Sequence, residues 1–86
     1  MMNISKFEFI KILKDNADKF DKDDIDATDL LSELGVDSLG FVMIIYAIEE
    51  KLNIKIDDND LKSLTSTSTV ADFVKVLAVL DIHIDM

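Results

Sequence analysis

The lack of proline and the scarcity of glycine limit this chain more than any other feature of its sequence. Its 86 residues include no proline, and Gly35 and Gly40 are the only glycines. Turn-rich β folds use both residue types at their turns, so their scarcity favours helices that are joined by polar loops. A chain of this length forms one domain with a modest core. We therefore predict a single all-α domain over residues 1–86.

Local capping signals set the bounds of the expected helices. Ser5 and Glu8 have the spacing of a capping box, and Thr69 opens a second pattern of this kind. Asp37 is a good N-cap for a helix that begins at Ser38. With apolar residues at helical spacing, the expected helices span residues 5–17, 38–53, 59–63 and 70–80. Three longer helices and one short helix predict a four-helix bundle.

The segments outside the helices are expected to be irregular. Residues 18–29 are acidic and lack periodicity, which predicts a long solvated loop, and one turn is expected over residues 29–34. Residues 54–57 are too short for more than an extended connector, and residues 81–86 predict a frayed tail. Gly40 costs about 1 kcal/mol relative to alanine inside a helix, which suggests that the first turn of its helix can loosen.

Apolar spacing also predicts how the helices are oriented. The expected stripe of the first helix comprises Phe7, Ile10, Leu13 or Lys14, and Ala17. The second helix is apolar without a break over residues 41–48, and its expected core face comprises Val42, Ile45, Ile48 and Leu52. With that orientation, Met43 and Tyr46 project into solvent near Ser38. An exposed apolar pair of this kind predicts a docking surface.

Composition limits the partners and the chemistry. Eighteen acidic and nine basic residues give a net charge of −9, which repels nucleic acid and anionic membranes. The same charge either attracts basic partners or only keeps the domain in solution, and it leaves both readings open. Without cysteine, any thiol must come from an added cofactor. The longest apolar run is too short for a bilayer and no signal core is present, so we expect a cytoplasmic monomer.

The strongest motif is the segment Leu-Gly-Val-Asp-Ser-Leu at residues 34–39. It resembles the attachment motif of acyl carrier proteins, whose serine accepts 4′-phosphopantetheine from coenzyme A. The resemblance extends over about fifty residues, with further matching segments at positions 42, 49–50, 52–54, 56–58 and 69–72. Independently of the resemblance, a serine in the first turn points outward, next to amides that can stabilise a phosphodiester.

The resemblance implies a stand-alone carrier that performs no catalysis itself. It implies that Ser38 bears covalent 4′-phosphopantetheine, which holds acyl intermediates as thioesters, and that Asp37 helps to hold magnesium during its transfer. The implied partners are a phosphopantetheinyl transferase and acyl-loading and acyl-processing enzymes with basic docking patches. The residues expected to contact partners are Asp37, Leu39, Val42, Met43, Tyr46, Glu49 and Glu50. As an alternative use of the apolar second helix, we expect a cleft that shelters the acyl chain and is lined by Phe41, Ile44 and Ala47.

Two positions depart from the pattern of the family. Carrier proteins of fatty acid synthesis usually have acidic residues where this chain has Gly40 and Met43. The pathway therefore stays open between fatty acid synthesis and a specialised acyl or polyketide pathway. The residues that follow Ser38 also resemble those of D-alanyl and other aminoacyl carrier proteins.

A calcium-binding protein and a hydrolase are the alternatives to a carrier. A calcium-binding helical protein is suggested by the acidic residues Asp15, Asp18, Asp21, Asp23, Asp24, Asp57, Asp58 and Asp60. Neither acidic segment has the central glycine and closing glutamate of an EF-hand loop, so no metal site is predicted. A hydrolase is disfavoured because the sole histidine, His83, lies in the expected tail and leaves Ser38 without a general base.

Overall fold

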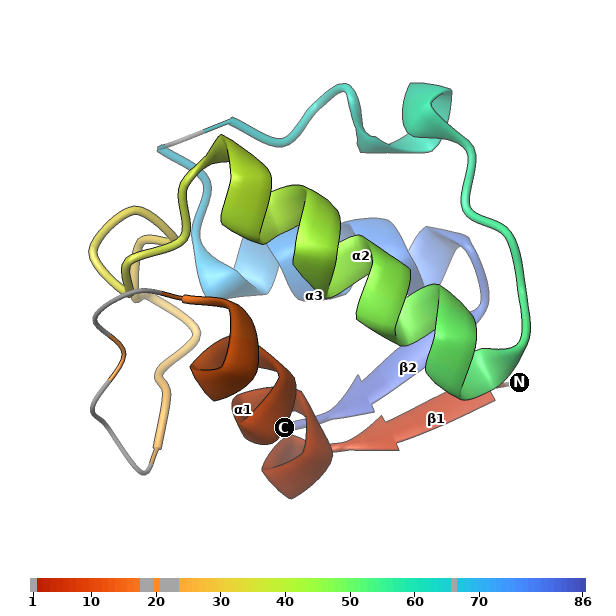
Figure 1. Cartoon of the computed structure of the whole chain (residues 1–86), viewed down its shortest axis with the longest axis horizontal. Helices are drawn as coiled ribbons and strands as arrows, with labels where there is room; N and C mark the ends of the chain where they lie inside the picture. Colours follow the sequence, from red (N-terminus) through yellow and green to blue (C-terminus); the bar gives the residue numbers. More distant parts are fainter. Residues whose placement is uncertain (1, 18–19, 21–23, 66) are drawn as a thin grey trace.

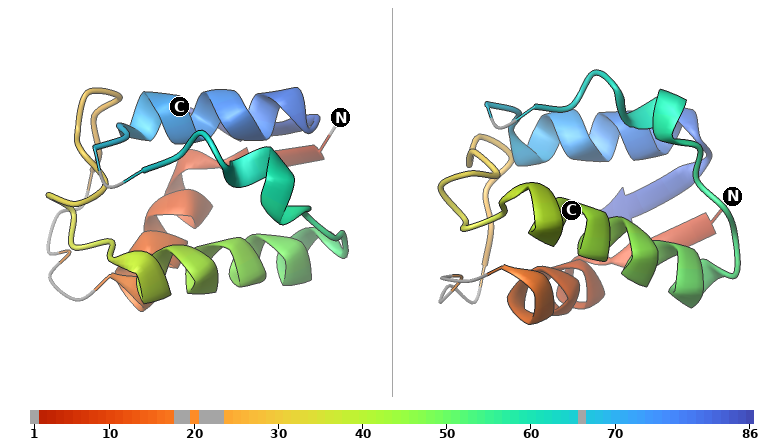
Figure 2. Two further views of the ribbon diagram at one scale, coloured as in Figure 1. Left: turned by 90° about the horizontal axis from the view of Figure 1, so that it is seen from above. Right: turned by 45° about the horizontal axis from the view of Figure 1, so that its top comes forward.

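Three α-helices pack around an apolar centre, and a pair of short strands joins the two ends of the chain (Figure 1). The structure is a computed structural model, which describes residues 2–17, 20, 24–65 and 67–86. In chain order its elements are β1 (Met2–Ser5), α1 (Lys6–Asn16), α2 (Ser38–Leu52), the single 3₁₀ turn η1 (Asp58–Leu61), α3 (Val70–Val79) and β2 (Ile82–Asp85). Figure 2 shows that η1 and the segments around it run past α2 and α3 on one side of the molecule.

The predicted caps are present at the helix starts. The Ser5 hydroxyl accepts a hydrogen bond from the Glu8 amide at 3.1 Å, and the Ser5 amide donates to Glu8 Oε1 at 3.4 Å. Thr69 and Asp72 form the same reciprocal pair at 3.2 and 2.9 Å. These caps satisfy amides that have no partner inside a helix, which is why α1 and α3 begin where the sequence predicts.

One phenylalanine ring from each α-helix meets in the core. Phe9 of α1 and Phe73 of α3 are tilted against each other with ring centroids 5.7 Å apart. Phe41 of α2 meets Phe73 edge to face, also at 5.7 Å. Aromatic pairs in this arrangement stabilise a core by about 0.5–1.5 kcal/mol beyond their buried area. The three rings therefore tie the three helices together.

The predicted stripe of α1 is partly wrong. Ile10, Leu13 and Ala17 are buried, but Phe7 is 78% exposed and Phe9 takes its place in the core. Each phenylalanine shares a helix face with part of the stripe, because Phe7 lies three positions before Ile10 and Phe9 lies four positions before Leu13. The strand before the helix fixes the choice, since Ile4 of β1 is itself fully buried.

The predicted core face of α2 is also partly wrong. Ile45 and Ile48 are buried as expected, but Val42 is 42% exposed. Ile44, which was the alternative lining of an acyl cleft, is buried in the core with 1% of its surface exposed. A helix that is apolar all round carries no sequence signal for its own rotation, so its neighbours decide which side chains are covered.

The expectation of a frayed tail is wrong. Residues 82–85 form β2, which pairs in parallel with β1 so that Met2 faces Ile82 and Ile4 faces Ile84. The alternation of apolar and polar residues in Ile-His-Ile-Asp is the signal that the sequence analysis missed. The four-helix prediction is corrected in the same way: the described residues form three α-helices, one 3₁₀ turn in place of the expected short helix, and a two-stranded sheet.

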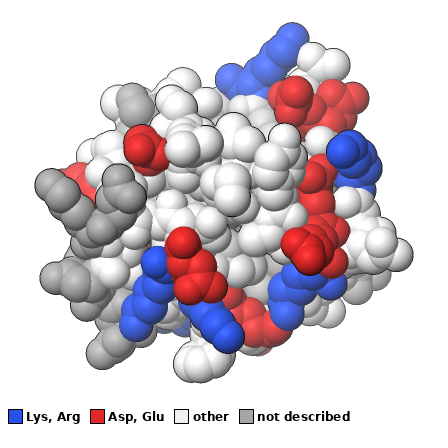
Figure 3. All heavy atoms as spheres, viewed as in Figure 1, with Lys and Arg blue, Asp and Glu red and all other residues white. Residues whose placement is uncertain are grey.

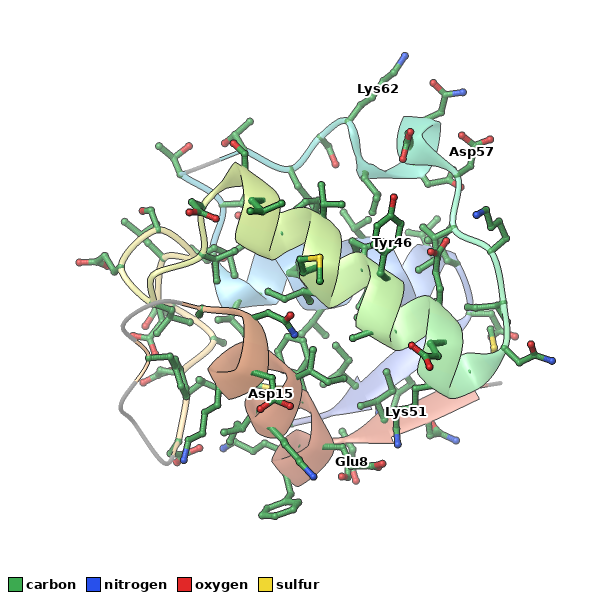
Figure 4. All side chains as sticks on the ribbon, viewed as in Figure 1. Glu8, Asp15, Tyr46, Lys51, Asp57 and Lys62 are labelled. Atoms are coloured by element: carbon green, nitrogen blue, oxygen red, sulfur yellow. The ribbon has the colours of Figure 1, made fainter. Side chains whose placement is uncertain are left out.

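Ion pairs connect α1 to its surroundings. Lys51 at the end of α2 pairs with Glu8, and Figure 4 shows the two side chains facing each other. The pKa of the Glu8 carboxyl is lowered, most of all by its hydrogen bond with Lys51 and less by its hydrogen bonds with Ser5. Lys6 pairs with Asp24 at 2.7 Å. Among the described residues, no helix is both long and apolar enough to cross a membrane.

The strand pair predicts a stability effect at the chain end. Ile82 has no exposed surface, so its replacement by alanine leaves a cavity. We expect Ile82→Ala to lower the free energy of unfolding by about 2–5 kcal/mol, measured by urea unfolding followed by circular dichroism.

His83→Ala is the matched control, because His83 lies on the same strand but is exposed. We expect this control to change the free energy of unfolding by less than about 0.5 kcal/mol. Equal, negligible effects of both variants would mean that the tail is frayed.

Candidate functional site

The turn before α2 sets the direction in which this helix starts. Leu31 and Leu34 are buried, and the Val36 amide donates a hydrogen bond to the Leu31 carbonyl at 3.0 Å. Gly35 closes the turn with a φ of 86°, a conformation that favours glycine. The Leu31 amide also donates to the Ser68 carbonyl at 3.0 Å, which anchors the turn to the segment before α3. The expected turn over residues 29–34 is thus confirmed.

Asp37 caps α2 as predicted, and Ser38 is the first residue of the helix. The Asp37 carboxylate accepts a hydrogen bond from the Gly40 amide at 2.6 Å. Ser38 is exposed, and no hydrogen bond to another described residue engages its hydroxyl. The hydroxyl is therefore accessible to a large enzyme, next to backbone amides that lack helical partners.

Gly40 allows the first turn of α2 to pack against the end of α1. A Cβ atom at this position would lie 2.8 Å from the Asn16 carbonyl oxygen and 3.1 Å from Asp37 Oδ1. The Asn16 oxygen belongs to the backbone, so it cannot move aside as a flexible side chain can. Gly40 therefore has a packing role, which the expectation of a loosened turn did not include.

Two grooves flank α2, and Phe41 and Val42 belong to the lining of both. The first groove has a volume of about 830 Å³ and contains Ser38 in its lining. Its lining also includes Leu31, Val36, Phe41, Val42 and Leu64. The second groove, of about 570 Å³, lies between α2 and η1. Its lining includes Phe41, Val42, Ile45, Tyr46, Ile56 and Leu61.

Part of this lining is predicted from the sequence. Phe41 lines both grooves, whereas Ala47 lines neither of them. Leu64 and Leu61 were missed as groove residues. Leu64 carries a signal in hindsight, because it is the one apolar residue in a run of hydroxyl side chains over residues 63–69.

An exposed apolar face runs along α2 from Ser38. Its members are Leu39, Val42, Met43 and Tyr46, which recur at the spacing of one helix face. Leu39 is 71% and Tyr46 57% exposed, so the predicted exposure of Met43 and Tyr46 extends over two further residues. Figure 3 shows uncharged side chains across the middle of this side of the molecule, with charged residues toward its edges. In Figure 4 the Tyr46 ring points toward η1.

The two glutamates near the end of α2 differ in their surroundings. Glu49 is half-buried, and its Oε2 accepts a hydrogen bond from the Ile56 amide at 2.6 Å. The Glu49 carbonyl accepts a further bond from the Ile54 amide at 3.0 Å. Glu49 therefore holds the connector that leads to η1 against α2. Glu50 is exposed.

Metal-site and hydrolase readings gain no support from the geometry. Among the residues that the structure describes, no group of three or more potential metal ligands lies together. Of the acidic residues considered for calcium, Asp18, Asp21 and Asp23 lie outside the described residues. His83 lies on β2, which pairs with β1 and not with the turn before Ser38.

Comparison with known proteins adds an independent observation. The profile of the family described as "Phosphopantetheine attachment site" matches residues 9–77. An acyl carrier protein of Buchnera aphidicola subsp. Baizongia pistaciae is 33% identical over 75 residues, which cover 87% of this chain and 95% of the relative.

Two further relatives match over shorter stretches. Acyl carrier protein 4, chloroplastic, of Arabidopsis thaliana is 41% identical over 46 residues, which are 54% of this chain and 34% of that protein. An acyl carrier protein of Campylobacter fetus subsp. fetus is 36% identical over 45 residues, 52% of this chain and 58% of the relative. No solved structure matches the chain significantly.

The close approach at Gly40 predicts that alanine is harmful there. Alanine favours a helix over glycine by about 1 kcal/mol, but overpacking against a fixed backbone costs about 1–3 kcal/mol. We expect Gly40→Ala to lower the free energy of unfolding by about 1–2 kcal/mol in urea titrations. Glu50→Ala, at an exposed position of the same helix, is the control and should be nearly neutral. A Gly40→Ala protein more stable than wild type would contradict the packing role.

Proposed function

This chain belongs to the acyl carrier protein family, and from that premise we propose that Ser38 bears its phosphopantetheine arm. As a member of this family the chain is a carrier rather than an enzyme, and its cofactor is covalent 4′-phosphopantetheine. The arm supplies a thiol, which the protein itself lacks, and an acyl group is carried on that thiol as a thioester.

Support for Ser38 comes from its exposure at the first turn of α2. In the attachment step its Oγ forms a P–O bond, the pyrophosphate of coenzyme A breaks with loss of adenosine 3′,5′-bisphosphate, and the hydroxyl proton passes to a base of the transferase. The resulting phosphodiester is anionic, and the N-terminus of α2 favours an anion there. Asp37 repels the product, so we assign it to capping and to holding magnesium during the transfer.

We assign docking of partner enzymes to the exposed apolar face of α2. Leu39, Val42, Met43 and Tyr46 provide the apolar contacts, and these residues begin beside Ser38. Glu50 is exposed and available for ion pairs with basic patches. The Glu49 carboxylate already accepts a hydrogen bond from the Ile56 amide of the connector, so Glu49 contributes to docking mainly through the negative charge that it adds to this surface. The net charge of −9 steers the carrier toward basic partners. These partners are a phosphopantetheinyl transferase and the enzymes that load and process the cargo.

An acyl cargo is favoured over an aminoacyl cargo. The grooves beside Ser38 are lined largely by apolar side chains, which stabilise an acyl chain that leaves water. The ammonium charge of an aminoacyl group gains nothing from the apolar part of this lining, and only the carboxylates at its edge, Asp37 in the first groove and Glu49, Asp57 and Asp58 in the second, could pair with it. We therefore propose a cytoplasmic, monomeric acyl carrier of fatty acid synthesis or of a specialised acyl or polyketide pathway, with a D-alanyl or other aminoacyl carrier as the alternative.

The proposed attachment site is tested by intact-mass spectrometry. Incubation with coenzyme A and a broad-specificity phosphopantetheinyl transferase should add one arm to the wild-type protein and none to Ser38→Ala. Ser32→Ala is the matched control, because Ser32 is also exposed and lines the first groove. Modification of Ser38→Ala would move the attachment site elsewhere, and an unmodified wild-type protein would end the proposal.

The proposed docking face is tested with a buried charge. Leu39→Glu places a carboxylate in an apolar contact, so we expect kcat/KM of the transferase to fall by about 10-fold or more. Val79→Glu introduces the same group at an exposed apolar residue of α3 and should leave kcat/KM unchanged. Equal rates for both variants and the wild type would exclude Leu39 from the docking face.

A further inference from the structure

We propose that Phe41 limits the length of the cargo by closing the path from the first groove into the second groove. This inference rests on the carrier function proposed above, and it assigns a specificity role to one residue of that site. The occupant of the groove is the chain's own acylated arm, because the attachment residue Ser38 is itself part of the groove lining.

Phe41 occupies the point at which the two grooves meet. It contributes to the lining of both the first and the second groove, and Val42 is the other residue that they share. Val42 is a small side chain with 42% of its surface exposed, so it forms part of the outer rim. Phe41 is half-buried and has the larger side chain. The ring of Phe41 is therefore the main barrier between the two grooves.

The core fixes the ring of Phe41 in this place. Phe41 meets Phe73 edge to face, with ring centroids 5.7 Å apart. Phe73 is 1% exposed and is held in turn by Phe9, which has no exposed surface. A close-packed interior resists displacement of such a ring. An acyl chain that enters beside Ser38 therefore meets an aromatic ring that packs against the core before it reaches the second groove.

Truncation of Phe41 should join the two grooves. The second groove continues the apolar lining with Ile45, Ile56 and Leu61, so a longer chain would find further surface to cover. Each additional methylene that leaves water stabilises the acylated protein relative to its unfolded form. The thermal midpoint, Tm, therefore reports how far along the chain the protein shelters the cargo.

The experiment compares acyl chains of graded length, from butyryl to myristoyl, on the full protein. A broad-specificity transferase installs each chain from its acyl-coenzyme A, and intact mass confirms the product. In the wild type we expect Tm to rise with chain length and then to level off. In Phe41→Ala and Phe41→Leu we expect Tm to keep rising, with an additional gain of about 4–8 °C for the longest chains relative to the butyryl form.

Phe7→Ala is the matched control, because it removes the same ring from an exposed position on α1. Its Tm should level off at the same chain length as in the wild type. Phe41→Leu guards against unfolding of the alanine variant, since leucine keeps an apolar side chain at the core. Unchanged length profiles in the Phe41 variants, with the arm attached, would overturn this inference alone. A wild-type protein that accepts no arm would overturn the carrier proposal as well.

Discussion

The contact between Phe41 and Phe73 joins the interior of the bundle to the groove beside Ser38. Phe73 also contacts Phe9, so a continuous row of rings connects all three α-helices. Loss of one such ring from a core costs about 3–5 kcal/mol, a large part of the stability of a domain of this size. Because Phe41 belongs both to this row and to the groove lining, the core cannot be repacked without changing the groove.

The position of Ser38 depends on a second constraint, the close approach of α1 and α2. A Cβ at position 40 would lie 2.8 Å from the Asn16 carbonyl oxygen, so a side chain with a carboxylate there would force α1 and α2 to shift apart. The family resemblance implies an acidic residue at this position in carriers of fatty acid synthesis. Packing thus removes a charge that partner enzymes could recognise. If partners dock on α2 as proposed, its exposed apolar face carries more of the recognition than it would in a carrier with an acidic first turn.

The sequence predicts the features that depend on neighbouring residues. The capping boxes at Ser5 and Thr69 and the N-cap at Asp37 act over three residues, and each was predicted correctly. The rotation of α2 was predicted less well, because a helix that is apolar on nearly all sides fits several orientations. Contacts with the rest of the fold select one of them, among them the close approach of Gly40 to α1 and the ring pair of Phe41. For the same reason the grooves, which join segments far apart in the sequence, were found only in part.

The strand pair was not predicted, because it also depends on segments that are far apart in the sequence. The alternation in Ile-His-Ile-Asp indicates a strand, but a strand needs a partner, and the partner lies at the opposite end of the chain. Ile4, Ile82 and Ile84 together bury a layer of apolar surface that the three helices alone would leave open. This layer lies toward the C-terminal half of α2, whereas Ser38 begins its N-terminal end (Figure 1). The protein therefore closes its core at one end and keeps Ser38, the proposed attachment residue, exposed at the other, so that access to Ser38 does not require the sheet to open.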